Sequence, residues 1–395
     1  MKVALVHDYI KEYGGAERVL KVLTNMYPKA PIYTAFTVKG STAEKAFGNI
    51  EIHESWLAPL LKIGKLYSPL RFLIPVIWGS FDLSKYDLVI TSCSWYITRG
   101  FKIGPRTKVI AYCHTPPRWL YGYATSVGFT KYWPVKIYSA IVGHFLRMYD
   151  YVSAQEPKRN PKSEIRNPKI TAGVDVFIAN SENVKRRIEK FYGRDAEVIY
   201  PPVDTKRIMN YELRIRNNNR NKNKYFLIVS RLVGAKGIDD VISAFETKDL
   251  SKYKLKIVGE KTGFMNYESG FKNENKNIEF LGRVGDEKLW ELYAGATGFL
   301  ALARDEDFGM TVVEAQATGT PVIAFNGGGF KESVIDGVTG LLINDTDEKT
   351  LREAIEKFNK IKWDRKKLQE NAKRFSRERF LRDFRGFARK VIPAD

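Results

Sequence analysis

The segment Asp305–Glu314, with the sequence DEDFGMTVVE, concentrates carboxylates in a chain whose formal net charge is +20. Glu306 and Glu314 are separated by seven residues. On a continuous helix such an offset corresponds to roughly 12 Å of rise. Two carboxylates that flank one glycosidic bond in a retaining hydrolase lie only about 5 Å apart. The spacing therefore argues against a nucleophile with an acid/base partner, and favours two hydrogen-bond acceptors that hold the two ends of an extended ligand.

The same segment contains groups that could bind a metal or a phosphate. Asp305 and Asp307 match the D-x-D pattern that holds a divalent cation in some enzymes, but we interpret them as capping, solvated residues. A helix is predicted to begin near Met310. Because N–H groups at a helix N-terminus bind phosphate well, those of Gly309, Met310 and Thr311 would lie between the two glutamates, available to a phosphate.

Two cations follow a predicted strand in the same half of the chain. Arg231 and Lys236 are five residues apart in VSRLVGAKG. Both could reach one diphosphate, arginine through its bidentate fork and lysine as a point charge. The alternative interpretation is a pair of surface cations in a basic protein.

Two candidates lie in the N-terminal half. Gly14 and Gly15 open a predicted helix directly after the first strand, where a phosphate could approach the exposed N–H groups; the alternative is a simple tight turn. His114 follows the strand KVIAY and so stands at the carboxyl end of a strand. For His114 the alternative is a structural histidine with satisfied hydrogen bonds.

Short apolar segments alternate with helical patterns along most of the chain, which is typical of buried parallel strands joined by crossover helices. We therefore predict an α/β protein with two doubly wound, Rossmann-like domains, 1–200 and 201–376. The basic amphipathic segment 377–395 is expected to form a helix that packs back on the first domain. Ligands bind beyond the carboxyl ends of such strands, so the predicted site is a cleft between the domains.

Composition and motifs exclude several classes of protein. The hydrophobic content is 44%, and the longest apolar runs stay far below the length that spans a bilayer. The N-terminus lacks a signal-peptide layout, so we expect a cytoplasmic protein. Cys93 and Cys113 have no metal-ligand spacing and are expected to be reduced and buried. Dinucleotide-binding, Walker, zinc-protease and serine-hydrolase signatures are absent.

Two basic runs, 157–169 and 212–224, each hold five Lys or Arg and one Glu among Asn and Pro. We predict that both are exposed loops. They lack the interleaved aromatic residues of nucleic-acid binding surfaces. The segments 56–78 and 129–149 do mix aromatic residues with Lys and Arg, as at a membrane interface, although ordinary core helices would explain them equally well.

With these residues, the sequence resembles the retaining nucleotide-sugar glycosyltransferases of the GT-B fold, glycosyltransferase family 4. The resemblance covers nearly the whole chain and is most specific in EDFGMTVVEAQATGTPVIAFNGGGFKESVIDGVTGLLI. The forms HDYIKEYGGAERV and HTPPR are most similar to a branch associated with mannosyl transfer in surface-polysaccharide and lipid-linked glycan assembly.

The resemblance implies a role for each candidate residue. Gly14 and Gly15 would contact the donor diphosphate, and His114 would line the donor sugar. The remaining roles fall in the second domain: Arg231 and Lys236 neutralise the diphosphate, Glu306 holds sugar hydroxyls, Glu314 holds the ribose, Gly309, Met310 and Thr311 bind phosphate through their amides, and Val284 lies near the base. Such enzymes need no bound metal or other cofactor, and a leaving phosphate oxygen accepts the proton of the acceptor.

We therefore expect a metal-independent retaining hexosyltransferase, with GDP-mannose as the favoured donor and a glycan or lipid-linked acceptor. The first domain would be the acceptor side and the second would bind the nucleotide sugar. An anionic membrane surface on the cytoplasmic side is a further expected partner; nucleic acid is not. The alternatives are a GT-B-like nucleotide-sugar epimerase and a basic nucleic-acid-binding protein. Asp307 and the insertion 157–169 depart from the family pattern.

Overall fold

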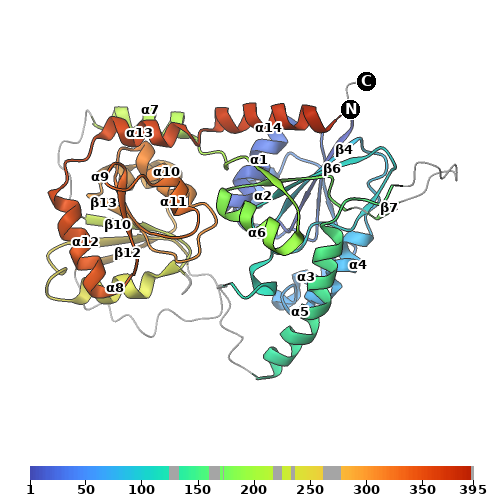
Figure 1. Ribbon diagram of the computed structural model, residues 1–395, viewed down its shortest axis with the longest axis horizontal. Helices are drawn as coiled ribbons and strands as arrows, with labels where there is room; N and C mark the ends of the chain where they lie inside the picture. The colour runs from blue at the N-terminus through green and yellow to red at the C-terminus, as the bar shows by residue number, and fades with distance from the viewer. Residues whose placement is uncertain are drawn as a thin grey trace. The chain divides into compact units, whose positions relative to one another are not determined.

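The computed structural model describes residues 1–123, 133–159, 170–171, 173–216, 225–232, 236–260 and 277–392. Its contacts divide the chain into two compact units (Figure 1). Among the described residues, the first unit comprises those up to Pro202 and those from Phe380 onward, and the second unit comprises those within Val203–Arg379. The divisions therefore fall two and three residues beyond the boundaries expected at 200/201 and 376/377.

The first unit is built on a parallel sheet with the strand order β3-β2-β1-β4-β6-β8-β9. Its strands are short and mostly buried, as the apolar segments predicted. The strands are β1 (Val3–His7), β2 (Ile32–Thr34), β3 (Ile52–Glu54), β4 (Leu88–Cys93), β6 (Lys108–Cys113), β8 (Val176–Ala179) and β9 (Ala196–Val198), with β5 (Lys102–Ile103) and β7 (Ile170–Thr171) in a separate antiparallel pair.

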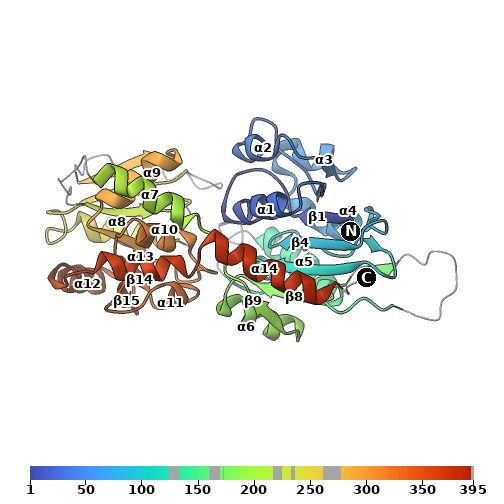
Figure 2. The same cartoon turned by 90° about the horizontal axis from the view of Figure 1, so that it is seen from above.

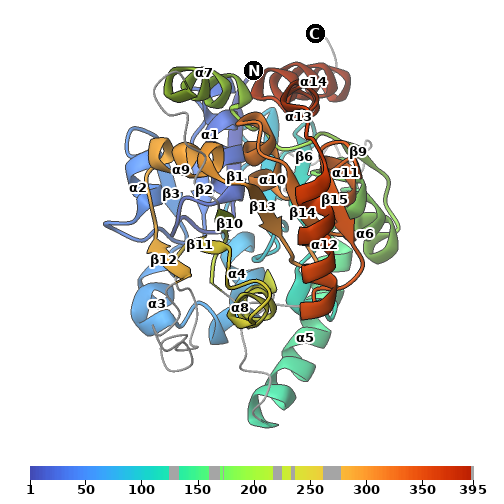
Figure 3. The ribbon, with the colours of Figure 1, turned by 90° about the vertical axis from the view of Figure 1, so that its left-hand side faces the viewer.

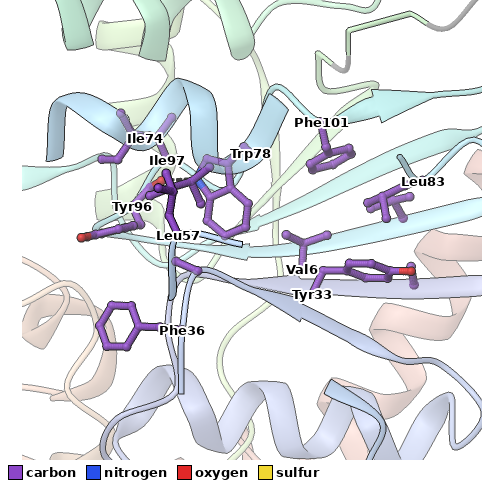
Figure 4. Packing of buried hydrophobic residues seen from close by; sticks show 14 of the residues in the cluster. Val6, Tyr33, Phe36, Leu57, Ile74, Trp78, Leu83, Tyr96, Ile97 and Phe101 are labelled. Carbon is purple, nitrogen blue, oxygen red and sulfur yellow. Dashed lines mark hydrogen bonds between the residues drawn. The ribbon is translucent and has the colours of Figure 1, made fainter. Parts of the chain in front are cut away.

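Helices cover both faces of this sheet (Figure 1). They are α1 (Gly15–Met26), α2 (Thr42–Phe47), α3 (Ala58–Lys62), α4 (Ile74–Gly79), α5 (Trp133–Ser153) and α6 (Glu182–Tyr192), with three 3-10 turns, η1 (Ile63–Lys65), η2 (Pro69–Leu73) and η3 (Arg118–Leu120). Alternation along β1 supplies both cores: Ala4 and Val6 face one, and Val3 and Leu5 the other. In the first core, the Trp78 side chain of α4 packs against buried hydrophobic side chains from segments that follow strands of the sheet (Figure 4).

The C-terminal helix α14 (Arg377–Val391) contributes to the core on the other face. Phe380, Phe384 and Ala388 are buried there together with Leu20 of α1. The Phe380 ring contacts Tyr112 of β6 edge-on, with 5.8 Å between centroids. Figure 2 shows this helix lying along the first unit.

The second unit has a parallel sheet of order β12-β11-β10-β13-β14-β15. Its strands are β10 (Tyr225–Val229), β11 (Lys254–Val258), β12 (Ile278–Gly282), β13 (Gly298–Ala301), β14 (Val322–Phe325) and β15 (Gly340–Ile343). Its helices are α7 (Thr205–Arg216), α8 (Ile238–Glu246), α9 (Asp286–Gly295), α10 (Met310–Ala317), α11 (Phe330–Ser333), α12 (Glu348–Lys360) and α13 (Arg365–Lys373). The prediction of two parallel α/β domains is confirmed.

The prediction of an exposed loop at 212–224 is wrong for its first five residues, which belong to α7. Glu212 is buried within the second unit and forms an ion pair with Arg365 of α13. The charged composition concealed an inward-facing pair, Ile208 and Glu212, one helical turn apart. Residues 217–224 lie outside the described part of the chain.

Most of the other basic run, 157–169, also lies outside the described residues. At its start, Arg159 is partly buried and pairs with Asp175 at 2.6 Å. Cys93 and Cys113 are both buried and carry no disulfide. Among the helices that the structure describes, none combines the length and apolar character that crossing a membrane requires.

Candidate functional site

In the first unit, three polar side chains meet at the carboxyl ends of neighbouring strands. The pairing of β1 with β4 places His7 opposite Ser92, and His114 follows β6, where its N–H donates to the Cys93 carbonyl at 2.9 Å. The Ser92 hydroxyl lies 3.0 Å from His7 Nδ1 and 2.8 Å from His114 Nε2. The sequence predicted only His114; the signal for His7 was a histidine that ends an apolar strand.

The two histidines of this group have pKa values shifted in opposite directions. Burial, together with the neighbouring His7, lowers the pKa of His114 to about 3, so its imidazole is neutral at physiological pH. Burial also opposes the charged form of His7, but the hydrogen bond and charge of Glu17 outweigh it and raise the pKa of His7. Of the two histidines, His7 is therefore the one whose surroundings favour the charged form.

Glu17 connects His7 to the Gly14–Gly15 turn. Helix α1 begins at Gly15, and the Gly14 N–H donates to Glu17 Oε2 at 2.9 Å. The other carboxylate oxygen of Glu17 lies 3.5 Å from His7 Nε2. Gly14 is partly exposed and Gly15 is exposed. The backbone of this turn is therefore accessible at the surface, while the Gly14 N–H is bound by the Glu17 carboxylate.

In the second unit, the predicted sugar and diphosphate residues contact each other. Lys236 Nζ donates to Glu306 Oε2, and the two side chains are 21% and 20% exposed. These residues follow β10 and β13, which are adjacent in the sheet. Arg231 also follows β10 and is exposed. The carboxyl edge of this sheet therefore holds two cations and a carboxylate within reach of solvent.

Helix α10 begins where the sequence predicted. Gly309, with φ +86°, is its N-cap, and Met310 and Thr311 form a first turn whose N–H groups have no intrahelical acceptor. Glu306 lies at the mouth of this helix: a side chain at Gly309 would come 3.5 Å from Glu306 Cγ. The first-turn N–H groups and the Glu306 carboxylate therefore both lie at the N-terminus of α10.

Glu314 points away from solvent, with 3% of its surface exposed. It accepts a hydrogen bond of 3.2 Å from the hydroxyl of Tyr293 on α9, a partner that the sequence did not indicate. Val284 precedes α9 and is partly exposed.

The glycine triplet 327–329 shapes the loop that carries Glu306. The Gly329 N–H donates to the Glu306 carbonyl at 2.9 Å. A Cβ at Gly328 would lie 2.3 Å from the Glu306 carbonyl oxygen, and one at Gly329 would lie 2.4 Å from that of Asp307. Only glycine permits this close approach of two backbone segments. The triplet thus fixes the backbone of the loop from which the Glu306 carboxylate extends.

Asp305 and Asp307 are both partly buried in the same loop. Across the described residues, no three His, Cys, Asp or Glu side chains gather as they would around a metal ion.

Comparison with known proteins identifies the family to which this architecture corresponds. Residues 13–207 match the family described as Glycosyltransferase Family 4, and residues 210–375 match Glycosyl transferases group 1. An uncharacterized glycosyltransferase of Methanocaldococcus jannaschii is 31% identical over 53% of this chain and 56% of its own length. The chain spans about half the length of the first curated relatives that it matches.

Two further proteins match over more of the chain. The alpha-1,3/1,6-mannosyltransferase ALG2 of Dictyostelium discoideum is 24% identical over 79% of this chain and 75% of its own. The structure of HepE from Anabaena, in complex with UDP and glucose, has a TM-score of 0.64 at 17% identity and covers 99% of this chain and 100% of that one. Together, the two parallel-sheet units and the two family matches show that the chain belongs to the family 4-type glycosyltransferases of the GT-B fold.

Proposed function

We propose that this protein is a retaining hexosyltransferase that moves a mannosyl group from GDP-mannose to a glycan or lipid-linked acceptor without a bound metal. The observation that carries the proposal is the Lys236–Glu306 ion pair at the N-terminus of α10. Cations, a carboxylate and first-turn helical amides without an intrahelical acceptor, all in one place, suit a ligand with both a diphosphate and sugar hydroxyls.

Each group has a distinct task in the proposed reaction. Arg231, Lys236 and the first-turn amides of α10 stabilise the negative charge that grows on the diphosphate as the glycosidic bond breaks. Glu306 accepts hydrogen bonds from hydroxyls of the transferred sugar, and Glu314 holds the ribose. His114 contacts the sugar as a neutral imidazole, because burial suppresses its charged form. The acceptor gives its proton to the leaving phosphate oxygen.

The mannosyl assignment rests on partial relatives. The match to the alpha-1,3/1,6-mannosyltransferase extends over 79% of this chain, and a lipopolysaccharide core biosynthesis mannosyltransferase of Rhizobium leguminosarum is 40% identical over 20% of it. HepE, whose structure contains UDP and glucose, supports a nucleotide-sugar donor in general. The donor base and sugar are therefore the first properties to measure.

The test is a calorimetric titration with GDP-mannose, UDP-glucose and ADP-glucose, each with and without EDTA, followed by NMR assignment of the product anomer. We expect GDP-mannose to bind most tightly, in EDTA as well, and the product to keep the α-configuration of the donor. Strict dependence on a divalent cation, or an inverted product, would overturn the mechanism. Conversion of the donor to an epimer without acceptor would favour the epimerase alternative.

We also propose that α5 attaches the protein to an anionic membrane surface. The exposed apolar residues of this helix lie within about 120° of one another around its axis, forming one stripe. They are Trp133, Ile137, Ile141, Phe145, Met148, Tyr151 and Val152. In Figures 1 and 3, the N-terminal half of α5 projects beyond the neighbouring elements of its unit. A membrane would bury this stripe and attract a chain of net charge +20.

Co-sedimentation with vesicles tests this attachment. We expect binding to vesicles that contain phosphatidylglycerol and weak binding to phosphatidylcholine alone. Ile137→Glu or Phe145→Glu should release the protein, whereas the same change at Ile335, an exposed apolar residue of the second unit, should not. Equal sedimentation of all variants at low salt would contradict the proposal.

A further inference from the structure

A continuous line of hydrogen-bonding groups connects the surface turn of α1 to His114. Glu17 contacts His7 Nε2, His7 Nδ1 contacts the Ser92 hydroxyl, and that hydroxyl contacts His114 Nε2. His7, Ser92 and His114 are buried, so water does not compete freely for these contacts. Within the described residues, Ser92 Oγ has no other side-chain hydrogen bond, and His114 Nδ1 has none at all.

We propose that Glu17, His7 and Ser92 are positioning residues that fix the tautomer of His114, so that its Nδ1 carries the proton and acts as a hydrogen-bond donor. The argument begins with Ser92. Its single hydroxyl hydrogen can point to only one of its two imidazole partners, so the other must donate to it. The protonation state of His7 therefore decides which ring nitrogen of His114 carries the proton.

The two arrangements differ by one proton. When His7 is charged, Nε2–H faces Glu17 and Nδ1–H donates to Ser92; the Ser92 hydroxyl then donates to His114 Nε2, which leaves the proton of His114 on Nδ1. When His7 is neutral, Glu17 retains the Nε2–H, and His7 Nδ1 accepts from Ser92. Ser92 must then accept from His114 Nε2–H, which leaves Nδ1 as a bare acceptor. The one proton that is lost in passing from the first arrangement to the second is released to solvent.

The electrostatic surroundings favour the first arrangement. Glu17 from α1 and Asp8, which follows β1, are the acidic groups facing His7, and both raise its pKa against the opposing effect of burial. Asp8 is held in place by the N–H groups of Ser94 and Trp95. On the other side, the Tyr112 ring contacts His114 edge-on and its hydroxyl donates to the Ile199 carbonyl. With His114 held neutral, its tautomer is the only protonation choice left to it.

The consequence for the reaction rests on the proposed function. A donor at Nδ1 suits a sugar hydroxyl or ring oxygen, whose lone pairs accept the hydrogen bond, and it costs no buried charge beside the forming cationic sugar. Glu17 also holds the Gly14 N–H, so one carboxylate supports both the predicted diphosphate turn and the sugar-binding histidine.

Long-range ¹H–¹⁵N correlation spectra of the ¹⁵N-histidine-labelled full chain test the proposal without any substrate. The chain has four histidines, so assignment by single substitution is practical. At pH 7 we expect His114 to show a protonated Nδ1 and a bare Nε2. In Glu17→Gln, where His7 loses its charged partner, we expect His114 to shift to the Nε2–H form. A wild-type His114 in the Nε2–H form would overturn the proposal.

Variants of Ser92 separate the hydrogen-bond line from simple packing. Ser92→Ala should leave His114 with mixed tautomers and lower kcat at least tenfold with a smaller change in KM, whereas Ser92→Thr, which keeps the hydroxyl, should restore the single tautomer. Thr91→Val is the matched control, because Thr91 is buried on the same strand and its hydroxyl finds no hydrogen-bond partner among the residues that the structure describes. If Ser92→Ala and Thr91→Val behaved alike, the line would be structural only.

The pH profile provides a third measurement. The kcat limb that falls as pH rises should reflect deprotonation of His7, and it should move to lower pH in Glu17→Gln. If kcat fell at the same pH in Glu17→Gln as in the wild type, the proposed link between His7 and His114 would be contradicted. Because the NMR result needs no donor, a chain that transferred no mannose would disprove the proposed function and leave the tautomer assignment standing.

Discussion

Lys236 and Glu306, seventy residues apart in the sequence, form an ion pair at the mouth of α10. Both side chains remain about a fifth exposed, so a bound ligand can reach them. A nucleotide sugar would place a diphosphate against Lys236 and hydroxyls against Glu306, and each residue would then exchange its present partner for a ligand group. The pair therefore holds both side chains in position before the donor binds.

Removal of Glu306 should separate binding from turnover. We expect Glu306→Gln to lower kcat by about 10²–10³-fold, the usual cost of losing one preorganised electrostatic contact, while the Kd for the nucleotide changes little. Transfer assays and calorimetry measure the two quantities. Retention of full activity would contradict the role assigned to Glu306.

The cations should show the opposite pattern. In the proposed reaction, Arg231→Ala and Lys236→Ala would each remove a charge-assisted contact to the diphosphate, so we expect nucleotide affinity to fall about 10–100-fold. Arg304→Ala is the control, because Arg304 is an exposed cation of the same unit that already pairs with Asp345. Equal nucleotide affinity in all three variants would exclude a diphosphate at this edge of the sheet.

The glycine triplet offers a test of loop geometry. Gly328→Ala places a Cβ 2.3 Å from the Glu306 carbonyl oxygen at a φ of +55°, so the loop must move. We expect a loss of about 2–4 kcal/mol in the free energy of unfolding, from overpacking and backbone strain together. Gly337→Ala has a similar φ of +71° but open space around it, so it should cost only about 1 kcal/mol. Denaturant unfolding of both variants measures the difference.

His114 should make the protein less stable in acid. Its pKa is about 3 in the folded chain and about 6.5 when exposed, so between these values the unfolded state binds a proton that the folded state refuses. Stability from this group is complete above pH 6.5 and falls as pH decreases, by ~2 kcal/mol at pH 5. His7 acts in the opposite sense, because its raised pKa stabilises the folded state at low pH and loses that effect as pH rises.

Unfolding by urea at pH 7 and pH 5 isolates the His114 contribution. We expect the wild type to lose more stability between these two pH values than His114→Gln does. If both proteins lost the same amount, the side chain of His114 would be titrating normally in the folded state.

The buried pair in the second unit predicts a non-additive result. Glu212 is almost fully buried, and one of its carboxylate oxygens has no hydrogen-bond partner within the described structure. Arg365→Met should therefore cost about 1–3 kcal/mol in the free energy of unfolding, because it leaves a buried charge unpaired. Arg365 is partly exposed, which keeps the loss below that of a fully buried pair. The double variant Glu212→Gln/Arg365→Met should recover part of the loss; an additive cycle would contradict this account.

Many of the strands were predictable because a buried strand is a short apolar segment, as in Val3–His7 and Gly298–Ala301. Prediction from the sequence failed at α7, where Glu212 looked solvated because its partner, Arg365, lies far along the chain. His7 and Ser92 were also missed, since their contact depends on β1 pairing directly with β4. Strand order is decided by tertiary packing, and no local pattern encodes it.

Helix α14 constrains the order in which the two units can fold during synthesis. Phe380, Phe384 and Ala388 fill the core that the strands of the first hundred or so residues begin. The ribosome must therefore translate the whole second unit before the first unit can complete its interior. Domains often fold in the order of their synthesis, but here the later unit is free to fold first, while an unfinished apolar surface waits for the final helix.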